Sequence, residues 1–360
     1  MILSYKKNLI STFVKNILMI SAFFFSLTLI MNILEEITFF KDIETSYILP
    51  LFLTLLNSFS VLFEIFPFIF LIGTMSFFME ILNKQELIIY KSYGLSNLNI
   101  ITVIVSTTFA VGLFLILIFY NISSNLKFLY YDIKSNYTKD DKYLAVVTAN
   151  GLWIKDQVED NINIINAENI MAENLNNVLI SQFDKKNNFI RLISSKKINI
   201  KDKTWIIKNP KITDQNLQTK KYEENTLFKT NFNSEIISTL FSNLSSLNLI
   251  KLKKLKRDYS KLGYSTTKID SYQLKIYMYP IYLSIMVCIA SILMLNIRYN
   301  KPRVFYLLAG ILASVLVYYM NYLFNILIEN QKIPFVFSVW FTQFILFLFC
   351  LIGLVRINEK

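Results

Sequence analysis

Six long apolar runs decide what this chain of 360 residues can fold into. A membrane-spanning helix needs about 20 mostly apolar residues. Runs of that length lie near 13–38, 51–79, 100–122, 276–297, 303–325 and 335–355. Lys6 and Lys7 precede the first run, as basic residues do in a signal peptide. We expect this run to be retained as a span, because it is too long and no small-residue cleavage site follows it.

Lysines and arginines beside the spans predict the orientation of the chain. With the N-terminus inside, ten flank the inner ends of the spans and two, Lys41 and Lys332, lie in the short outer loops. The inner ten are Lys6, Lys7, Lys15, Lys84, Lys91, Arg298, Lys301, Arg303, Arg356 and Lys360. We therefore expect both termini to be cytoplasmic and the long polar segment 123–275 to lie outside.

The polar segment between the third and fourth spans predicts an inserted all-β unit. Apolar bursts such as Leu152 to Ile154, Phe189 to Ile193 and Trp205 to Ile207 alternate with polar turns such as 184–188. Short strands at this spacing favour an antiparallel sandwich. The predicted fold is a membrane α-helical protein of six transmembrane helices, 3+3, with this inserted unit. Its predicted parts are 1–122 (spans 1–3), 123–235 (β), 236–275 (amphipathic helix and linker) and 276–360 (spans 4–6).

After Asn233 the apolar spacing becomes helical. One stripe, ended by Gly263, is formed by Leu249, Leu252, Leu255, Tyr259 and Leu262. Basic side chains decorate the remainder, namely Lys251, Lys253, Lys254, Lys256, Arg257 and Lys261. The pattern predicts an amphipathic helix that packs on the sandwich or lies at the outer membrane boundary with a solvated basic face. A basic face beside anionic lipid head groups is the alternative interpretation.

Missing residue types exclude several functions. The chain has no histidine, so His-ligated metal sites and Ser-His-Asp triads are impossible. Cys288 and Cys350 both fall inside apolar runs, which leaves the polar middle without a disulfide framework. The chain also lacks G-x-x-x-x-G-K, so it has no phosphate-binding loop of its own. We expect no catalytic residue, no metal site, no cofactor and no nucleic-acid partner, and any energy must come from another chain.

A polar segment, 79–99, separates the second and third apolar runs. Leu87, Ile88 and Tyr90 fall near helical spacing, which predicts a short amphipathic helix. Gly94 follows it, and glycine takes the left-handed conformation that ends a helix without strain. So short a helix needs a surface to dock on. A protein partner and the lipid interface both satisfy that requirement.

Residues 85–96, QELIIYKSYGLS, resemble the cytoplasmic coupling helix of the LptF/LptG permeases. The family pattern there is Ser-Glu-Leu, a short variable stretch, an aromatic or small residue, and Gly-Leu/Phe-Ser/Thr. The resemblance implies that the coupling helix lies within 80–96, that Glu86 faces a partner ATPase and that Gly94 closes the helix. The expected coupling residues are Glu86, Leu87, Tyr90, Lys91 and Gly94. We expect Glu86 on the exposed side, with Leu87 and Tyr90 filling a groove of the ATPase.

The resemblance covers essentially the whole chain, because three spans, an outer domain and three more spans follow in the family order. GLWIKD, at 151–156, resembles the start of the outer domain in LptG-type members and implies a β-jellyroll. The implied function is that of a lipopolysaccharide export permease of ABC type in the bacterial inner membrane, with its large domain periplasmic. The implied partners are a sister LptF/LptG-type permease, an LptB-type ATPase dimer carrying ATP-Mg, an LptC-like single-span protein and an LptA-like periplasmic bridge. The alternatives are a lipoprotein-release or macrolide-export permease, which usually carries its outer domain after the first span, and a lipid-modifying enzyme.

Polar side chains gather on the first, second and fifth spans. They are Asn32, Glu35 and Glu36 in the first, Asn57, Ser60 and Glu64 in the second, and Tyr318, Asn321, Tyr322 and Asn325 in the fifth. Such residues make helix–helix hydrogen bonds or line a cavity. In the resembling family these three spans line the lipopolysaccharide cavity, which implies the second role. LptG-type members often carry a lysine in the outer first span, and its absence here moves the expected phosphate contact to Lys41 or a partner chain.

Overall fold

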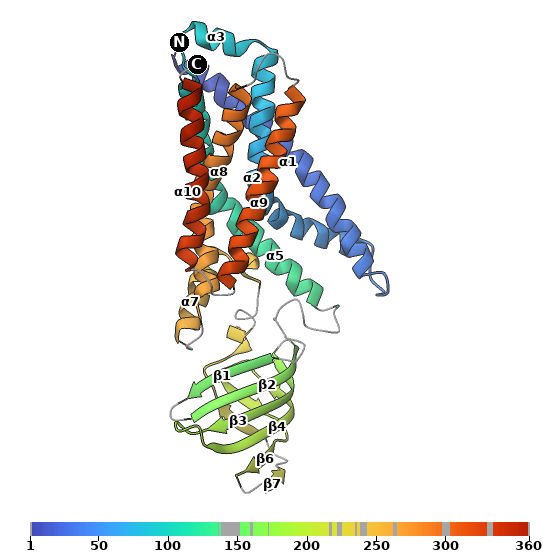
Figure 1. Ribbon diagram of the computed structural model, residues 1–360. Helices are drawn as coiled ribbons and strands as arrows, with labels where there is room; N and C mark the ends of the chain where they lie inside the picture. Colours follow the sequence, from blue (N-terminus) through green and yellow to red (C-terminus); the bar gives the residue numbers. More distant parts are fainter. Residues whose placement is uncertain are drawn as a thin grey trace. The chain divides into compact units, whose positions relative to one another are not determined.

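The computed structural model describes residues 2–135, 137, 152–158, 161–171, 173–215, 218–221, 225–234, 236–237, 243–261, 265–296, 303–329 and 334–358. The chain forms two compact units (Figure 1). One combines Met1–Lys127 with Thr267–Lys360, and the other is Phe128–Thr266. Gly151 and Gly263, to which the sequence assigns roles, lie outside the described residues.

The first unit is a helical bundle. Within the described residues, six helical stretches are long and apolar enough to cross a membrane. They are α1 (Ile2–Phe39), α2 (Ile48–Asn83), a continuous third stretch, α8 (Thr267–Leu295), α9 (Arg303–Glu329) and α10 (Phe335–Asn358). The third stretch joins α4 (Asn97–Phe114), the π-helical turn η1 (Leu115–Phe119) and α5 (Tyr120–Ser135). The predicted membrane-helical fold with an insertion after the third span is confirmed.

The two halves of the bundle meet closely where α4 crosses α8. A Cβ added to Gly112 would lie 2.8 Å from the Cα of Pro280, so the two backbones touch at this point. Small residues permit such contact between membrane helices. Nearby, the Phe63 ring of α2 stacks on the Tyr279 ring of α8 with centroids 4.5 Å apart. The Tyr279 hydroxyl also donates to the carbonyl of Phe63, which joins the halves at a second point.

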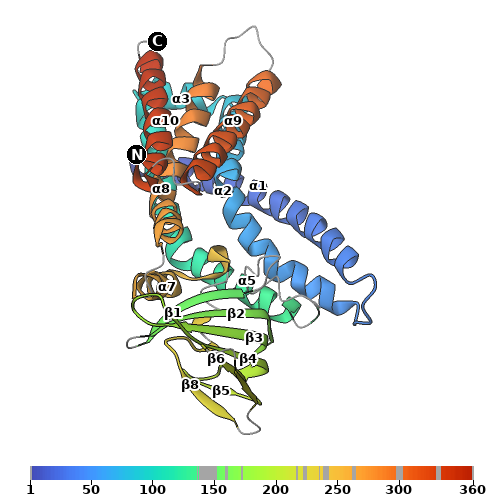
Figure 2. The same cartoon turned by 60° about the horizontal axis from the view of Figure 1, so that its bottom comes forward.

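The α1–α2 pair reaches out from the rest of the bundle, and α1 has a largely exposed side. In both views the pair leans away from the other helices toward the loop that joins α1 to α2 (Figures 1 and 2). One side of α1 packs against α2, and the other side leaves large apolar side chains such as Leu18, Phe23 and Met31 exposed. In a membrane, this exposed side would meet lipid or another protein.

The second unit is built on an antiparallel sheet. Its described strands are β1 (Leu152–Val158), β2 (Asn161–Met171), β3 (Asn174–Phe183), β4 (Phe189–Asn199), β5 (Thr204–Ile207), β6 (Lys211–Asp214), β7 (Thr219–Lys221) and β8 (Thr226–Lys229). The path runs β1-β2-β3-β4-β5-β8, with β6 pairing with β4 and β7 with β6. The predicted all-β insertion is confirmed. Asp184 begins the tight turn between β3 and β4, where its carboxylate accepts from the backbone amides of Lys186 and Asn188 at 2.8 Å each.

The sheet is rolled, so that its first and last strands come together. Side chains of β1 alternate between buried and exposed, and Asp156 lies on the buried side. Its carboxylate accepts from the Thr230 hydroxyl at 2.6 Å and from the Asn231 side-chain amide at 2.8 Å, just beyond β8. Trp205 of β5 is fully buried and donates to the carbonyl of Phe232 at 2.8 Å. A single hydrogen-bonded sheet therefore forms the facing layers predicted as a sandwich. Figure 2 shows β5 and β8 turned out of the plane of β1–β3.

A short amphipathic helix belongs to this second unit. It is α7 (Leu249–Lys261), preceded by the 3-10 turn η2 (Leu244–Ser246), and it lies where the sequence predicts such a helix. Leu252 and Leu255 are buried, whereas Ile250 is exposed. The Lys251 ammonium lies 4.1 Å from the centroid of the Phe128 ring. Leu262, the last residue of the predicted stripe, lies outside the described residues.

Candidate functional site

The helix α3 (Glu86–Ser92) fills the polar segment between the second and third spans. Gln85 separates it from α2 with a left-handed backbone at φ 56°. The next span then starts at Ser96, whose hydroxyl accepts from the backbone amide of Asn99 at 3.2 Å. Serine in this role satisfies an orphan amide at the start of a helix. The chain therefore stops one helix, forms a short second one and starts a third within a few residues.

Gly94 ends α3 as predicted. Its φ is +80°, in the left-handed region that favours glycine. The Leu95 amide donates to the carbonyl of Tyr90 at 3.2 Å, and the Gly94 amide donates to that of Lys91 at 2.9 Å. These two bonds are the Schellman motif, which pairs carbonyls that the end of a helix would leave unsatisfied.

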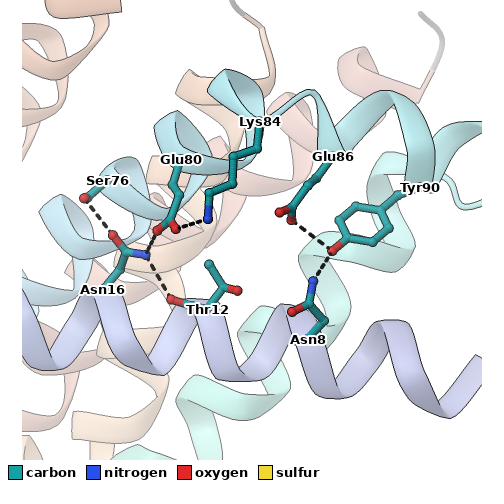
Figure 3. A network of polar contacts seen from close by, with 8 residues as sticks. All are labelled: Asn8, Thr12, Asn16, Ser76, Glu80, Lys84, Glu86 and Tyr90. Atoms are coloured by element: carbon teal, nitrogen blue, oxygen red, sulfur yellow. Dashed lines mark hydrogen bonds and ion pairs between the residues drawn. The ribbon is translucent and has the colours of Figure 1, made fainter.

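The Tyr90 hydroxyl joins α3 to the start of α1. It accepts from the side-chain amide of Asn8 at 3.0 Å and donates to the carboxylate of Glu86 at 3.3 Å (Figure 3). The Tyr90 ring also lies 6.5 Å from the Tyr5 ring, measured between centroids. Burial raises the pKa of the Tyr90 hydroxyl, so this group keeps its proton and its donor role throughout the neutral range.

A second polar cluster, centred on Asn16, joins α1 to the end of α2. The Asn16 side-chain amide donates to the Glu80 carboxylate at 2.7 Å, and its oxygen accepts from the Ser76 hydroxyl at 2.8 Å. Glu80 also pairs with Lys84, with nitrogen and oxygen 2.7 Å apart. Figure 3 shows this cluster two turns along α1 from the Asn8 contact. The first helix is therefore held at two levels, by α3 through Tyr90 and by the end of α2 through Ser76 and Glu80.

The outward face of α3 differs from the predicted one. Tyr90, expected to be presented to a groove, is only 7% exposed, because its ring packs on α1 and its hydroxyl is engaged there. Its part in binding an ATPase stays a prediction. Leu87 is half-buried. The large apolar side chains that point outward are Ile88 at 67%, Ile89 at 50% and Tyr93 at 68% exposure. Of the other predicted coupling residues, Glu86 is half-buried and Lys91 is exposed.

A cavity of about 720 Å³ lies within the helical unit. Five helices contribute to its wall, which is mainly apolar and aromatic. Its residues include Phe24, Leu27 and Thr28 from α1, Glu64 and Phe68 from α2, Tyr272, Lys275, Tyr279 and Tyr282 from α8, Ser314, Tyr318 and Asn321 from α9, and Val339 and Gln343 from α10. An apolar cavity with a few polar groups has the character of a binding site for an amphiphilic molecule.

The polar groups of the wall lie at separate points. The Glu64 carboxylate is largely exposed and stands 3.6 Å from the Lys127 ammonium. On the opposite half of the bundle, the Asn321 side-chain amide donates to the Tyr282 hydroxyl at 3.2 Å. Gln343 is 9% exposed, and its side-chain oxygen has no hydrogen-bond partner among the described residues. The wall therefore offers charge and hydrogen-bonding capacity at a few defined places.

The polar residues predicted to line a cavity lie in different surroundings. Glu64, Tyr318 and Asn321 are on the wall. Asn32 instead donates to the Ser58 hydroxyl at 2.9 Å, a contact between α1 and α2. Among the rest, Glu36 and Ser60 are buried, Asn57 is half-buried, Glu35, Lys41 and Tyr322 are exposed, and Asn325 lies in α9. Contact of this set with a lipid stays a prediction.

Several residues of these sites escaped the sequence interpretation. Tyr272, Tyr279 and Tyr282 recur at helical spacing in the fourth span, and that recurrence was a usable signal for a shared face. The isolated amide of Gln343 in an apolar run was another. Asn8 and Asn16 gave no such signal, because polar residues near the end of a span are common. Among the described residues, no group of three or more His, Cys, Asp or Glu side chains is placed to hold a metal ion.

Comparison with known families matches nearly the entire chain. The family described as "Lipopolysaccharide export system permease LptF/LptG" matches residues 7–356. No curated protein matches the chain. The family match spans the six helical stretches, α3 and the inserted β unit together.

Proposed function

Because the chain belongs to the LptF/LptG family of lipopolysaccharide export permeases, we propose that it is a membrane subunit through which a separate ATPase drives lipopolysaccharide out of the inner membrane. At the level of the family, the chain is a multi-pass inner-membrane protein of a lipopolysaccharide export complex. The observation that carries the finer proposal is the outward apolar face of α3, formed by Ile88, Ile89 and Tyr93.

The outward face of α3 suits a protein groove. Two isoleucines and an aromatic ring project from one short helix, with the Glu86 carboxylate in its first turn. A helix bound in a groove uses apolar anchors of this kind, and a charged residue beside them selects the partner. Lys84 precedes the helix and Lys91 lies in its last turn, and the Lys/Arg bias supports a cytoplasmic location for this loop. A soluble ATPase, with ATP-Mg bound to it rather than to this chain, would reach α3 from that side.

The cavity supports the lipid part of the proposal. Its wall is largely apolar, as acyl chains require, and Glu64 and Lys275 supply charged groups beside it. A volume of about 720 Å³ is in the range of pockets for drug-sized ligands. Lipopolysaccharide is far larger, so a second surface must hold the remainder. A sister LptF/LptG-type permease on the exposed side of the bundle would supply that surface in a heterodimer.

The proposed direction of transport follows from the orientation of the chain. With α3 cytoplasmic, the β unit after the third span is periplasmic, and its rolled sheet is the part that would pass lipopolysaccharide to an LptA-like β bridge. An LptC-like single-span protein completes the proposed assembly. Another β protein can bind such a sheet by adding strands to an open edge.

The test is co-purification of the ATPase with α3 variants. Glu86→Lys reverses the charge, and Ile88→Asp places a charge in the apolar face. Losing one partner of a desolvated charge pair costs roughly 2–5 kcal/mol at an interface, so binding should weaken by well over tenfold. Both variants should insert normally into the membrane, yet they should lose the ATPase and the transfer of lipopolysaccharide to a soluble bridge protein.

Two controls separate docking from damage to α3. Glu86→Gln removes the charge but can still accept the hydrogen bond from Tyr90. This variant should therefore retain more ATPase binding than Glu86→Lys. Asn83→Ala changes an exposed residue at the end of α2, outside the apolar face, and should bind normally. If Glu86→Lys and Ile88→Asp retain the ATPase and transport, α3 is a connector on the lipid surface and the proposal fails.

A further inference from the structure

The contacts of α3 with α1 have a role that docking of an ATPase does not explain. Tyr90 turns inward, and its hydroxyl bridges Asn8 of α1 and Glu86 of its own helix. Figure 3 shows this bridge between α3 and α1, and Tyr90 is buried whereas Ile88 is 67% exposed. A residue used only to hold the helical form of α3 has no need of a partner 82 positions away in the sequence.

The first helix is continuous from this bridge to the cavity. It runs from Ile2 to Phe39 without a proline or glycine, the residues that commonly bend helices. Phe24, the first cavity residue of α1, lies sixteen positions after Asn8, or about 24 Å along the axis. Leu27 and Thr28 follow on the same wall. A displacement applied at Asn8 therefore reaches the wall of the cavity through a single stiff element.

The packing of α1 leaves it room to respond. One side of this helix is exposed, from Leu18 to Met31 and beyond, so a shift of α1 is opposed mainly by its packing against α2. The cluster around Asn16 ties α1 to the end of α2 but does not involve α3. The Tyr90 hydroxyl is thus placed to connect α3 directly with α1, in addition to the covalent route through α2.

We propose that Tyr90 and Asn8 form a tie that transmits the movement of α3 to α1 and so to the cavity wall. This inference rests on the proposed function. The two residues are positioning residues: they take no part in binding the ATPase and none in contacting the lipid. Glu86 is half-buried: its carboxylate holds the Tyr90 hydroxyl in place for Asn8, and its exposed part is left to meet the ATPase. Loss of the tie separates ATP hydrolysis from lipid movement.

The experiment compares Tyr90→Phe, Asn8→Ala and their combination in the complete complex in proteoliposomes. Tyr90→Phe keeps the buried ring and removes only the hydroxyl, and Tyr47→Phe is the matched control, because Tyr47 is 94% exposed and precedes α2, at the opposite end of that helix from α3. We expect normal ATPase binding and normal ATP hydrolysis in all variants. Lipopolysaccharide transferred per ATP should fall about fivefold in each single variant, which is the effect of one ordinary hydrogen bond on an equilibrium. The double variant should fall no further, because both changes remove the same bond.

A second measurement follows the movement itself. A nitroxide attached at Met31→Cys, on the exposed side of α1, should change its spectrum when ATP is added. Tyr90→Phe should abolish that change, while Tyr47→Phe should keep it. The inference is overturned if Tyr90→Phe leaves transfer per ATP and the spectral change intact, or if it loses the ATPase as Glu86→Lys does. If the unaltered complex hydrolyses ATP but moves no lipopolysaccharide, the proposed function is wrong. The spectral change still shows in that case whether Tyr90 and Asn8 transmit movement to α1.

Discussion

Replacing Gly94 with valine isolates the contribution of one backbone conformation to the docking helix. Gly94 has a φ of +80°, and a Cβ built on it meets nothing within 4 Å. A side chain at this position therefore clashes with no neighbour, and the whole cost comes from the left-handed backbone. The two hydrogen bonds that close α3, from Gly94 to Lys91 and from Leu95 to Tyr90, depend on that conformation.

The size of the effect follows from known backbone energies. A residue with a Cβ pays about 1–2 kcal/mol in the left-handed region, and a β-branched residue is especially disfavoured there. Asparagine tolerates the region far better, because its side chain bonds locally to the backbone. A change of this size shifts the equilibrium between the closed and the frayed end of α3 by roughly 5- to 30-fold.

Hydrogen exchange measures this equilibrium directly. In Gly94→Val, the amides at positions 94 and 95 should exchange roughly 5- to 30-fold faster than in the unaltered protein, and ATPase binding should weaken. In Gly94→Asn both should stay close to the unaltered values. Equal exchange rates in the valine and asparagine variants would refute the reasoning, because the left-handed conformation would then not be what closes the helix.

Three further predictions concern the rest of the chain. Cysteines placed at the exposed positions Ser46 and Lys186 should react with an impermeant thiol reagent added from the periplasmic side, whereas one at Ser92 should not; the opposite pattern contradicts the proposed orientation. The β unit, excised with its flanking helices, should give a strand-rich circular dichroism spectrum that is insensitive to chelators and reductants, and a spectrum without strand character argues against the sheet. Asp156→Ala leaves buried donors unsatisfied, so it should lower the unfolding free energy of that unit by roughly 1–3 kcal/mol in denaturant titrations, while the exposed control Asp202→Ala should change it little.

The architecture was predictable because its signals are local in the sequence. Each span is a run of apolar residues, and the length of the run alone shows that it can cross a membrane. The strands and the turn at Asp184 are likewise marked by neighbouring residues. Gly94 was identifiable for the same reason, since glycine directly after a helical stretch predicts a left-handed end.

The orientation of α3 was not predictable, because a partner distant in the sequence decides it. Helical spacing shows that Glu86 and Tyr90 share a face, but it does not show which face turns inward. Asn8 decides that, by engaging the Tyr90 hydroxyl from 82 positions away. The cavity was not predictable for the same reason, because Tyr272 and Gln343 line it only when five helices pack around one space.

The rolled sheet also sets the order in which the chain completes its structure. Asp156 on the first strand forms a hydrogen bond with Thr230, which lies 74 positions later in the sequence. Trp205 likewise forms its hydrogen bond with the carbonyl of Phe232, which is synthesised later. Closing so long a loop costs entropy before the contacts repay it, and such topologies form slowly. The α1–α2 hairpin, whose Asn32–Ser58 contact spans 26 positions, meets no such delay. During synthesis, the helices that precede the sheet can therefore pair while the sheet stays open until nearly its entire length has emerged.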